Sequence, residues 1–353
     1  MSSGANAVVE PLSELSAGYA HELVELCGRW NVAPGALLEG TGLTKASLRD
    51  PASRLSLEAC QTIVHRAREL TGQPGLAFFM GLQMRLSWHG FLGFASMTAG
   101  SVREALEIAE RFSLTRTAAF GLATYVEGKQ ACLVLEEREP LGSPALRELR
   151  EFAVIALLVG IGQIARAVTG RPIDGVAECA FPEPDYAAPI LARAAEAKAG
   201  TMRFGQPAHR LLFEASILDL PLVTADPVAM ELARAQCDRE LAALVERAGL
   251  SGRVRSALGK PSEGFRSVDE VARRVHLSTR TLKRKLASEG TSFTQLLEDV
   301  RRQRALLLLD DRDLGVAEIA ARLGYSDVAN FTRAFRRWTG TTPAALRKGR
   351  QRA

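Results

Sequence analysis

The stretch that decides the fold of the C-terminal part spans residues 316–343 and reads VAEIAARLGYSDVANFTRAFRRWTGTTP. Its beginning has the apolar spacing of a short helix, which a turn at residues 324–326 interrupts. Asp327 is a natural N-cap for a second helix, in which Phe331 and Phe335 lie four positions apart and therefore face inward together. Two short helices joined by a tight turn are the pattern of a helix-turn-helix.

A second copy of this pattern occupies residues 268–286, which read VDEVARRVHLSTRTLKRKL. Ala272 and Ala320 hold the same place in the two first helices, and their small side chains let another helix cross closely. Ser278 takes the N-cap place of Asp327. The first helices are offset by 48 positions and the second helices by 49, because the second copy has one more turn residue. A repeated pattern predicts two helix-turn-helix units, whereas a single copy would often be merely structural.

The exposed face of the second helix in each unit carries the candidate contacts to DNA. Such a helix enters the major groove with its N-terminal residues first. In the first unit this face carries Arg280, Thr281, Lys283 and Arg284. Arg and Lys donate to guanine O6 and N7, and a bidentate pair contributes about 1–3 kcal/mol of discrimination. In the second unit it carries Val328, Ala329, Asn330 and Arg333, which suit a thymine methyl and an adenine edge and should discriminate less by Arg–guanine contacts.

Residues 293–309 predict one helix between the two units, about 25 Å long at 1.5 Å per residue. Its apolar residues would pack both units onto it. A rigid spacer of this length would place two recognition helices in successive major-groove segments, which recur about every 34 Å on one face of DNA. A shorter separation would require the DNA to bend.

The charge of the chain is unevenly divided. The 353 residues carry 45 Lys and Arg against 40 Asp and Glu, a net charge of +5. Residues 253–353 hold 22 basic and 11 acidic residues, a net charge of +11, so the remaining 252 residues carry −6. A basic unit joined to an acidic body favours a nucleic-acid partner over a merely solvated basic surface.

Composition excludes several classes of protein. Apolar residues make up 47% and charged residues 24%, as in ordinary globular proteins. Five scattered cysteines, none in a Cys-x-x-Cys pair, argue against a disulfide framework and a zinc site and fit a cytoplasmic location. The first 20 residues lack the Lys and Arg of a signal peptide. The longest uncharged stretch, residues 152–165, is too short to cross a bilayer and indicates a buried core helix, so no membrane partner is expected.

The N-terminal part mixes helices and strands. Helical spacing covers residues 59–70, 102–112, 146–168 and 226–248. Residues 120–126 and 130–136 alternate around Gly128 and predict a β-hairpin, and short strands are expected at 176–181, 201–204 and 209–213. The fold class is therefore a mixed α/β N-terminal domain followed by an all-α C-terminal domain with two helix-turn-helix motifs joined by a linker helix. We expect an N-terminal segment at 1–24, a first domain at 25–235, a linker region at 236–252 and the DNA-binding domain at 253–350.

Residues 253–350 closely resemble the DNA-binding part of the AraC/XylS family of bacterial transcription regulators. The most specific match covers residues 317–343, including the closing Gly-x-Thr-Pro, and extends to Arg347. The resemblance implies base or backbone contacts for Arg280, Thr281, Lys283, Arg284, Ala329, Asn330 and Arg333. We expect Arg336 to contact a DNA phosphate.

The N-terminal part is similar, over roughly residues 25–235, to the N-terminal domain of the ornithine-utilisation subgroup of this family. The matching residues are 89–95, 201–205, 218–222 and 225–227. That domain is usually labelled an arabinose-type binding and dimerisation domain. The resemblance implies a sensor or dimerisation domain without naming the effector.

Together these features predict a sequence-specific transcription regulator of double-stranded promoter DNA, controlled by a small-molecule effector of unknown identity. A homodimer is a further expectation, and RNA polymerase would be a partner if the protein is an activator. One alternative fuses the DNA-binding unit to an enzymatic or methyl-accepting N-terminal domain; another is a nucleoid-type binder that has no effector.

Few other residues suggest a site. His89, beside Trp88 and Phe91, is a weak candidate for contact with the effector and is otherwise a packed structural residue. The acidic pairs at residues 136–137 and 310–311 are interpreted as solvated ends of elements. No spacing typical of a catalytic residue set, a metal site or a cofactor-binding loop occurs, so the sequence predicts no enzyme and no cofactor.

Overall fold

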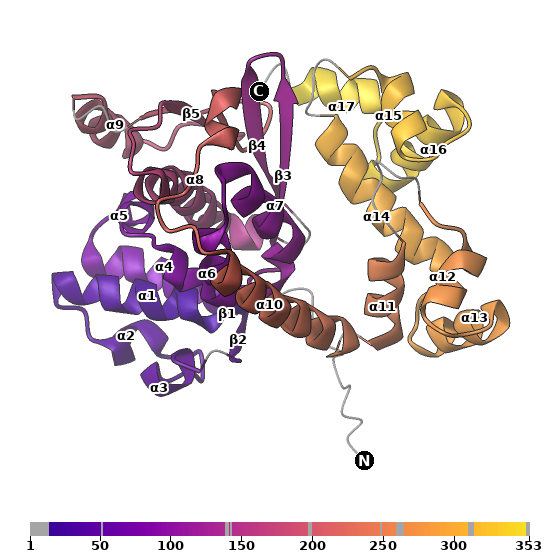
Figure 1. Cartoon of the computed structure of the whole chain (residues 1–353), viewed down its shortest axis with the longest axis horizontal. Helices are drawn as coiled ribbons and strands as arrows, with labels where there is room; N and C mark the ends of the chain where they lie inside the picture. Colours follow the sequence, from indigo (N-terminus) through magenta and orange to yellow (C-terminus); the bar gives the residue numbers. More distant parts are fainter. Residues whose placement is uncertain are drawn as a thin grey trace. The chain divides into compact units, whose positions relative to one another are not determined.

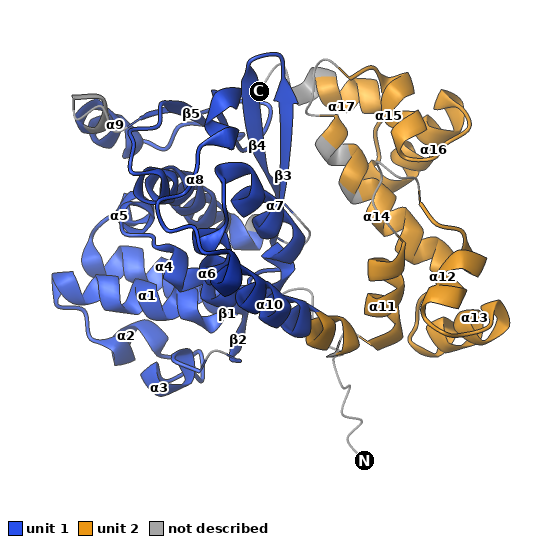
Figure 2. Ribbon diagram, in the orientation of Figure 1, with its two compact units in different colours: residues 1–241 blue, residues 242–353 orange. Residues whose placement is uncertain are grey.

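The computed structural model describes residues 14–50, 52–137, 141, 143–196, 200–247, 249–258, 265–309 and 314–350. The chain divides into two compact units, residues 1–241 and 242–353 (Figures 1 and 2). Residue 25, the expected start of the first domain, lies within a helix of the first unit. Residues 236–252, the expected linker region, are helical wherever the structure describes them.

The first unit contains helices and two sheets. Its helices are α1 (Ala17–Cys27), α2 (Pro34–Leu38), α3 (Lys45–Leu48), α4 (Leu57–Thr71), α5 (Leu76–Leu82), α6 (Gly90–Thr98), α7 (Val102–Phe112), α8 (Arg147–Thr169), α9 (Ala187–Glu196) and α10 (Pro227–Arg247). Its strands are β1 (Glu14–Ser16), β2 (Arg54–Ser56), β3 (Phe120–Glu127), β4 (Gln130–Glu137), β5 (Gly175–Glu178), β6 (Thr201–Arg203) and β7 (Arg210–Glu214). The mixed α/β architecture predicted for this part is confirmed.

The larger sheet has the strand order β3-β4-β7-β5-β6, and only the pair β5–β6 is parallel. The predicted hairpin is confirmed: β3 and β4 pair from Phe120 opposite Glu137 to Glu127 opposite Gln130. Gly128 makes the turn with a φ of 59°, in the left-handed region that glycine enters without steric cost. A second sheet pairs β1 with β2 and so joins the start of the unit to the chain before α4.

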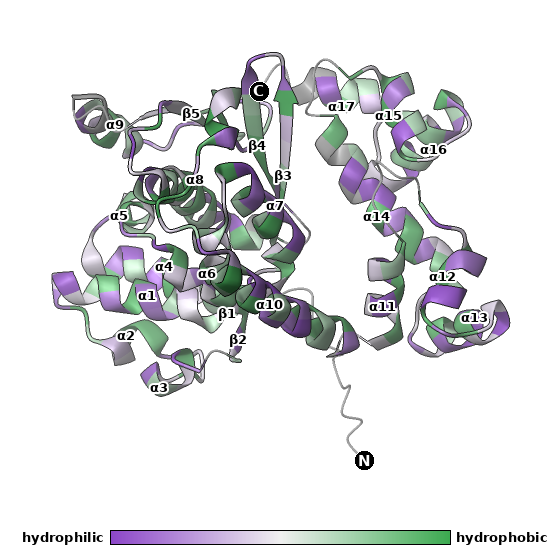
Figure 3. Cartoon of the chain, viewed as in Figure 1, coloured by the Kyte–Doolittle hydropathy of each residue, from purple (hydrophilic) through white to green (hydrophobic). Residues whose placement is uncertain are grey.

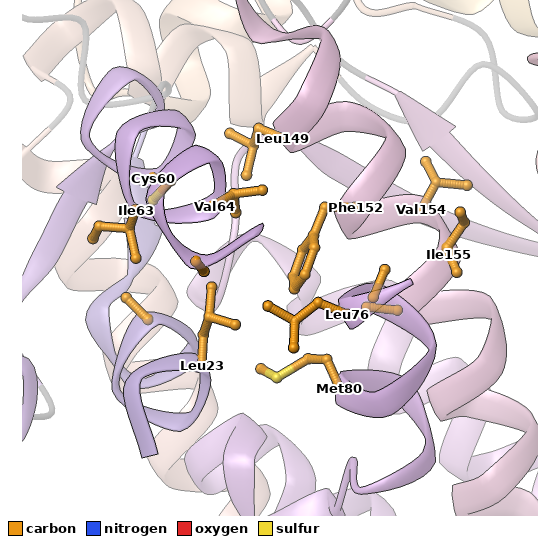
Figure 4. Close-up of a cluster of buried hydrophobic side chains, with 14 of the residues drawn as sticks. Leu23, Cys60, Ile63, Val64, Leu76, Met80, Leu149, Phe152, Val154 and Ile155 are labelled. Carbon is orange, nitrogen blue, oxygen red and sulfur yellow. The ribbon is translucent and has the colours of Figure 1, made fainter. Parts of the chain in front are cut away.

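The first core of this unit lies between α1, α4, α5 and α8 (Figure 4). It also contains residues from one face of the larger sheet. Val154, Ile155 and Leu158 of α8 are buried in it, as expected for the uncharged stretch of residues 152–165. By length and composition alone α8 would be able to cross a membrane. Here α5 and α8 pack closely, since a Cβ added at Gly81 would lie 2.7 Å from the Val159 Cβ.

A second core joins α6, α7 and α10. Asp226 precedes the long helix α10, and its carboxylate accepts hydrogen bonds from the main-chain N–H groups of Val228 and Ala229 at 3.1 and 3.0 Å. The helix buries Met230, Ala233 and Cys237 against the neighbouring helices. This burial explains why the helix continues into the region that the sequence suggested as a linker.

Among its described residues, the second unit contains helices and no strands. It contains the end of α10 and the helices α11 (Gly249–Ala257), α12 (Val268–Arg274), α13 (Thr279–Ser288), α14 (Phe293–Leu308), α15 (Val316–Arg322), α16 (Val328–Thr339) and α17 (Pro343–Arg350). Two separate cores hold it together, one around α11–α13 and the other around α15 and α16, and α14 contributes residues to both. The predicted linker helix is therefore confirmed, and it ends one residue earlier than expected.

Candidate nucleic-acid interface

The first helix-turn-helix is formed by α12 and α13. A capping box starts α12, in which the Ser267 N–H donates to the Glu270 carboxylate at 2.8 Å and the Glu270 N–H donates to Ser267 Oγ at 3.3 Å. Ser278 caps α13 by accepting from the Thr281 N–H at 3.2 Å. On the inner side of α13, Leu282 and Leu286 are fully buried. The sequence therefore positions α13 by one apolar face, which leaves the opposite face to the solvent.

That outer face of α13 is strongly basic. Arg280, Lys283 and Arg284 are exposed at positions i, i+3 and i+4, so they share one side of the helix. Figure 3 shows hydrophilic residues over much of α12 and α13. Within the described part of the chain, none of these three cations forms an ion pair or a side-chain hydrogen bond. Their donors are therefore available to a partner.

The second helix-turn-helix is formed by α15 and α16 and has an aromatic core. Phe331 and Phe335 are fully buried with ring centroids 5.7 Å apart, and Tyr325 lies 5.6 Å from Phe331. Arg301 of the linker helix α14 lies over the Tyr325 ring at 4.8 Å and donates to the Gly324 carbonyl at 3.4 Å. These contacts fix the turn of the second helix-turn-helix to the linker helix.

The outer face of α16 differs from that of α13. Val328, Ala329, Asn330 and Arg333 are all exposed, as predicted from their spacing. The Asn330 amide, however, already donates to the Asp327 carboxylate, and its oxygen accepts from Arg333 at 2.6 Å. An adenine edge would have to compete with both hydrogen bonds. Sequence spacing gave no sign of this arrangement.

The two recognition helices also differ at their N-termini. Ser278 caps α13 without a charge, whereas the carboxylate of Asp327 caps α16 and accepts from the Asn330 N–H at 2.7 Å. Hydrogen bonds, above all that from the Asn330 main chain, hold the pKa of Asp327 below its usual range, so the cap is anionic at neutral pH. An anion at this end offsets the positive end of the helix dipole.

Two further arginines near the end of the chain have different roles. Arg336 is exposed on α16 and has no side-chain partner among the described residues, which suits a phosphate contact. Arg347 of α17 donates to the main-chain oxygens of Leu309 and Leu314 at 3.2 and 2.9 Å. It therefore joins α17 to both ends of the segment between α14 and α15.

In the first unit, His89 lies in a polar cluster. Its Nδ1 is 2.6 Å from the Tyr19 hydroxyl, and their rings meet edge to face. Burial and the nearby Arg116 lower the pKa of His89 to about 4, so the imidazole is neutral at pH 7. Tyr19 and Arg116 lie 70 residues or less from His89 in the chain but on different elements, and no motif connects them. The only feature of the sequence that points to this cluster is that Arg116 is the sole charged residue between Arg111 and Glu127.

One of the two predicted acidic pairs is not a solvated end. Glu137 lies close to Arg150 Nε at 2.6 Å and to His209 Nε2 at 3.3 Å. His209 itself is only 4% exposed. The interpretation of Glu137 as a solvent-facing end of a strand is therefore wrong, because strand pairing brings it to a buried histidine. Residues 310–311 lie outside the described residues.

Known proteins resemble the chain over most of its length. Residues 32–222 match the arabinose-binding domain of AraC transcription regulator, N-terminal, and residues 271–349 match a helix-turn-helix domain. The Ornithine utilization regulator of Pseudomonas aeruginosa is 32% identical over 94% of this chain and 95% of its own length. VqsM, an HTH-type transcriptional regulator of the same species, is 34% identical over 41% of this chain and 43% of its own length.

Among solved structures, the transcriptional regulator CdpR from Pseudomonas aeruginosa covers 93% of this chain and 96% of its own, with 24% sequence identity and a TM-score of 0.45. The match to the arabinose-binding domain covers more than half of the chain, and the match to the Ornithine utilization regulator covers nearly all of it. On these two matches, together with the double helix-turn-helix of the second unit, the chain belongs to the AraC family of DNA-binding transcription regulators.

Proposed function

We propose that this regulator reads promoter DNA mainly with α13. The observation that carries the proposal is the exposed face formed by Arg280, Lys283 and Arg284, whose donors have no partner among the described residues. Thr281 lies beside them in the first turn, next to the Ser278 cap. Arg donors suit the O6 and N7 acceptors of guanine, so this helix supplies most of the base discrimination.

The second recognition helix, α16, has a smaller part in base readout. Val328 and Ala329 contact a thymine methyl, while Asn330 and Arg333 reach a base or the backbone once their mutual hydrogen bond is released. Arg336 contacts a phosphate and so adds affinity without sequence preference. The different contributions of α13 and α16 to base readout follow from the different side chains on their outer faces.

The first unit senses a small molecule and joins two copies of the chain. The match to an arabinose-binding domain supports effector binding, and His89 is one candidate contact. Dimerisation would place two DNA-binding units on a repeated operator sequence. As an activator the protein would contact RNA polymerase, and its place of action would be the cytoplasm.

We also propose that the protein is not an enzyme. All five cysteines are buried. Burial raises the pKa of Cys27, Cys60 and Cys179 to about 12 and that of Cys237 to about 11, and it also raises that of Cys132. Thiols of this kind are protonated at neutral pH and are poor nucleophiles. They therefore do not suit the methyl-accepting role considered from the sequence.

The test is to map the genomic fragments that bind the full-length protein and to compare one bound promoter fragment with random DNA of equal length. We expect the promoter fragment to bind at least about 1,000-fold more tightly at physiological salt, as for other specific regulators. Equal binding of both fragments would contradict sequence-specific regulation and would favour a nucleoid-type binder.

A further inference from the structure

Arg116 is a buried arginine that lacks a carboxylate partner among the described residues. It is only 8% exposed and follows the short 3-10 helix Ser113–Thr115. Four other arginines of the first unit with side chains no more than 30% exposed each have an acidic partner. These pairs are Arg68–Glu151, Arg150–Glu137 and Arg210–Glu178, all at 2.6 Å, and Arg66–Glu39 at 2.8 Å. Burying a charge is costly unless it is paired, so the most buried of these five arginines requires an explanation.

The surroundings of Arg116 satisfy only part of its donors. Its Nη2 donates to Ser16 Oγ at 2.5 Å, whereas its Nε has no hydrogen-bond partner. Its Nη1 faces Gly90, where an added Cβ would lie 2.9 Å away. A guanidinium has five N–H donors, so this one retains hydrogen-bonding capacity beside a backbone that has no side chain.

Tyr19 and His89 complete the cluster. The Tyr19 ring lies 5.9 Å from the Arg116 guanidinium, and its hydroxyl is 2.6 Å from His89 Nδ1. Both side chains are partly exposed and Gly90 is exposed, so the cluster reaches the surface of the unit. When the Tyr19 hydroxyl donates to Nδ1, the proton of the neutral imidazole is on Nε2, which is then a donor.

Among the described residues, no carboxylate forms an ion pair with Arg116. Arg54 lies nearby and donates to the main-chain oxygen of Thr115 at 2.5 Å and to that of Arg116 at 3.4 Å, so it brings no anion to the Arg116 guanidinium. The group that would balance Arg116 is therefore expected from outside the chain. We propose that Arg116, Tyr19 and His89 form a binding site for the carboxylate of a small organic acid.

A carboxylate fits this site better than a phosphate does. The Arg116 Nε has no hydrogen-bond partner, and a carboxylate with one negative charge balances this guanidinium and accepts from a planar fork. A phosphate carries up to two charges and three acceptor oxygens and needs more donors than this cluster offers. The rest of the effector would extend from the exposed side at Gly90.

An electrostatic interaction relates the site to helix α10. Burial raises the pKa of Cys237 on this helix, and the charge of Arg116 is among the smaller influences that lower it, so the two side chains lie within electrostatic range of each other. The helix α10 runs from Pro227 to Arg247, across the boundary between the two units at residue 241. A ligand that neutralises Arg116 would therefore change the electrostatic surroundings of the helix that leads into the DNA-binding unit. This inference rests on the effector-binding part of the proposed function.

The experiment measures ligand binding to the full-length protein in the absence of DNA, so its result is independent of the test of DNA recognition. The probes are sodium acetate, hexanoate and benzoate, their uncharged amides as matched controls, and inorganic phosphate, all at one ionic strength. Calorimetric titration and the thermal midpoint are recorded. We expect saturable binding and a raised midpoint with at least one carboxylate and neither effect with its amide.

Variants separate a ligand contact from a structural role. Arg116→Gln should abolish binding, and Arg116→Lys should weaken it at least about tenfold because a lysine lacks the planar fork. Tyr19→Phe should weaken binding without disturbing the fold, which keeps the test valid if Arg116→Gln does not fold. Without ligand, Arg116→Gln should match or exceed the thermal midpoint of the wild type, since an uncompensated buried charge is removed.

Arg68 offers a matched control, since it is 16% exposed and paired with Glu151. Arg68→Gln should lower the thermal midpoint and leave carboxylate binding intact. The proposal is overturned if no carboxylate binds, if a carboxylate and its amide act alike, or if Tyr19→Phe and Arg116→Lys both bind like the wild type. Binding of phosphate alone would overturn the choice of a carboxylate.

Discussion

His276 and Gly324 hold the same left-handed backbone conformation at equivalent points of the two helix-turn-helix units, with φ of 57° and 73°. Each follows the end of the first helix, and its N–H donates to a carbonyl three residues back, Arg273 in one unit and Ala321 in the other. The turn therefore requires positive φ in both units. Glycine reaches this region without steric cost, whereas a residue with a Cβ is strained there by roughly 1–2 kcal/mol.

We predict that His276→Gly stabilises the first helix-turn-helix by about 0.5–1 kcal/mol, because relief of backbone strain exceeds the extra entropy that glycine gives the unfolded chain. Gly324→Ala, the matched change, should destabilise the second helix-turn-helix by about 1–2 kcal/mol. Its Cβ would also approach Arg301 Nη2 at 3.3 Å. Thermal and urea unfolding of the full chain measure both. Destabilisation by His276→Gly would show that the His276 side chain contributes more to stability than its left-handed backbone conformation takes away.

The charged cap of α16 is predicted to weaken DNA binding. Asp327→Ser keeps a good N-cap and removes one negative charge from the end of the helix that we propose to enter the DNA groove. Affinity for any DNA should rise roughly two- to fivefold at low salt, and the gain should shrink as salt screens the charge. Fluorescence anisotropy with promoter and random fragments measures this.

The first helix-turn-helix offers the reciprocal control. Ser278→Asp places a carboxylate at the cap of α13 and should lower affinity for both fragments by a similar factor while the thermal midpoint stays unchanged. If Asp327→Ser instead lowered affinity for the promoter fragment alone, Asp327 would be accepting a hydrogen bond from a base.

Glu137 is predicted to make stability depend on acidic pH. Burial raises the pKa of this carboxyl, but hydrogen bonds and charges from His209 and Arg150 outweigh it and hold the pKa at about 2, below the ordinary 4.5. A group whose pKa is lowered by folding stabilises the fold above its unfolded pKa. This contribution, about 2–3 kcal/mol at pH 7, is lost as pH falls from about 4.5 towards 2.

The comparison with Glu137→Gln isolates this contribution from that of other carboxylates. The variant should be less stable than the wild type at pH 7, and the difference should narrow between pH 4.5 and 2 in urea unfolding followed by circular dichroism. A difference that stays constant over this range would mean that the amide loses packing rather than charge.

Local patterns predicted the elements whose signals are local. The caps Ser278 and Asp327 and the hairpin around Gly128 depend on residues within a few positions of one another, and the structure confirms each of them. The helical parts of the first unit before residue 57 were not predicted. Short helices such as α2 and α3 owe their stability to burial of Leu37 and Leu48 in a core assembled from distant segments.

The same distinction applies to the candidate sites. The spacing of Arg280, Lys283 and Arg284 on one helix predicted their shared exposed face, because the helical period fixes it. Spacing carries no information about Tyr19, His89 and Arg116, which only tertiary packing brings together. It likewise could not show that Asn330 bonds to Asp327 and Arg333, because the choice of side-chain rotamers decides that contact.

Arg284 and Arg336 should affect DNA binding in different ways. Arg284→Ala removes the base contact that we propose and should reduce binding of the promoter fragment by about tenfold or more, with a smaller loss on random DNA. Arg336→Ala removes the proposed phosphate contact and should weaken the binding of both fragments equally. If the wild type neutralises about six phosphates, log K falls with log salt at a slope near −5, and Arg336→Ala should make this slope shallower by about one. Titrations at several salt concentrations with both fragments measure these quantities. Equal losses for the two variants on both fragments would contradict the assigned roles, and a wild-type slope near zero would mean that the +11 charge of residues 253–353 does not contact DNA.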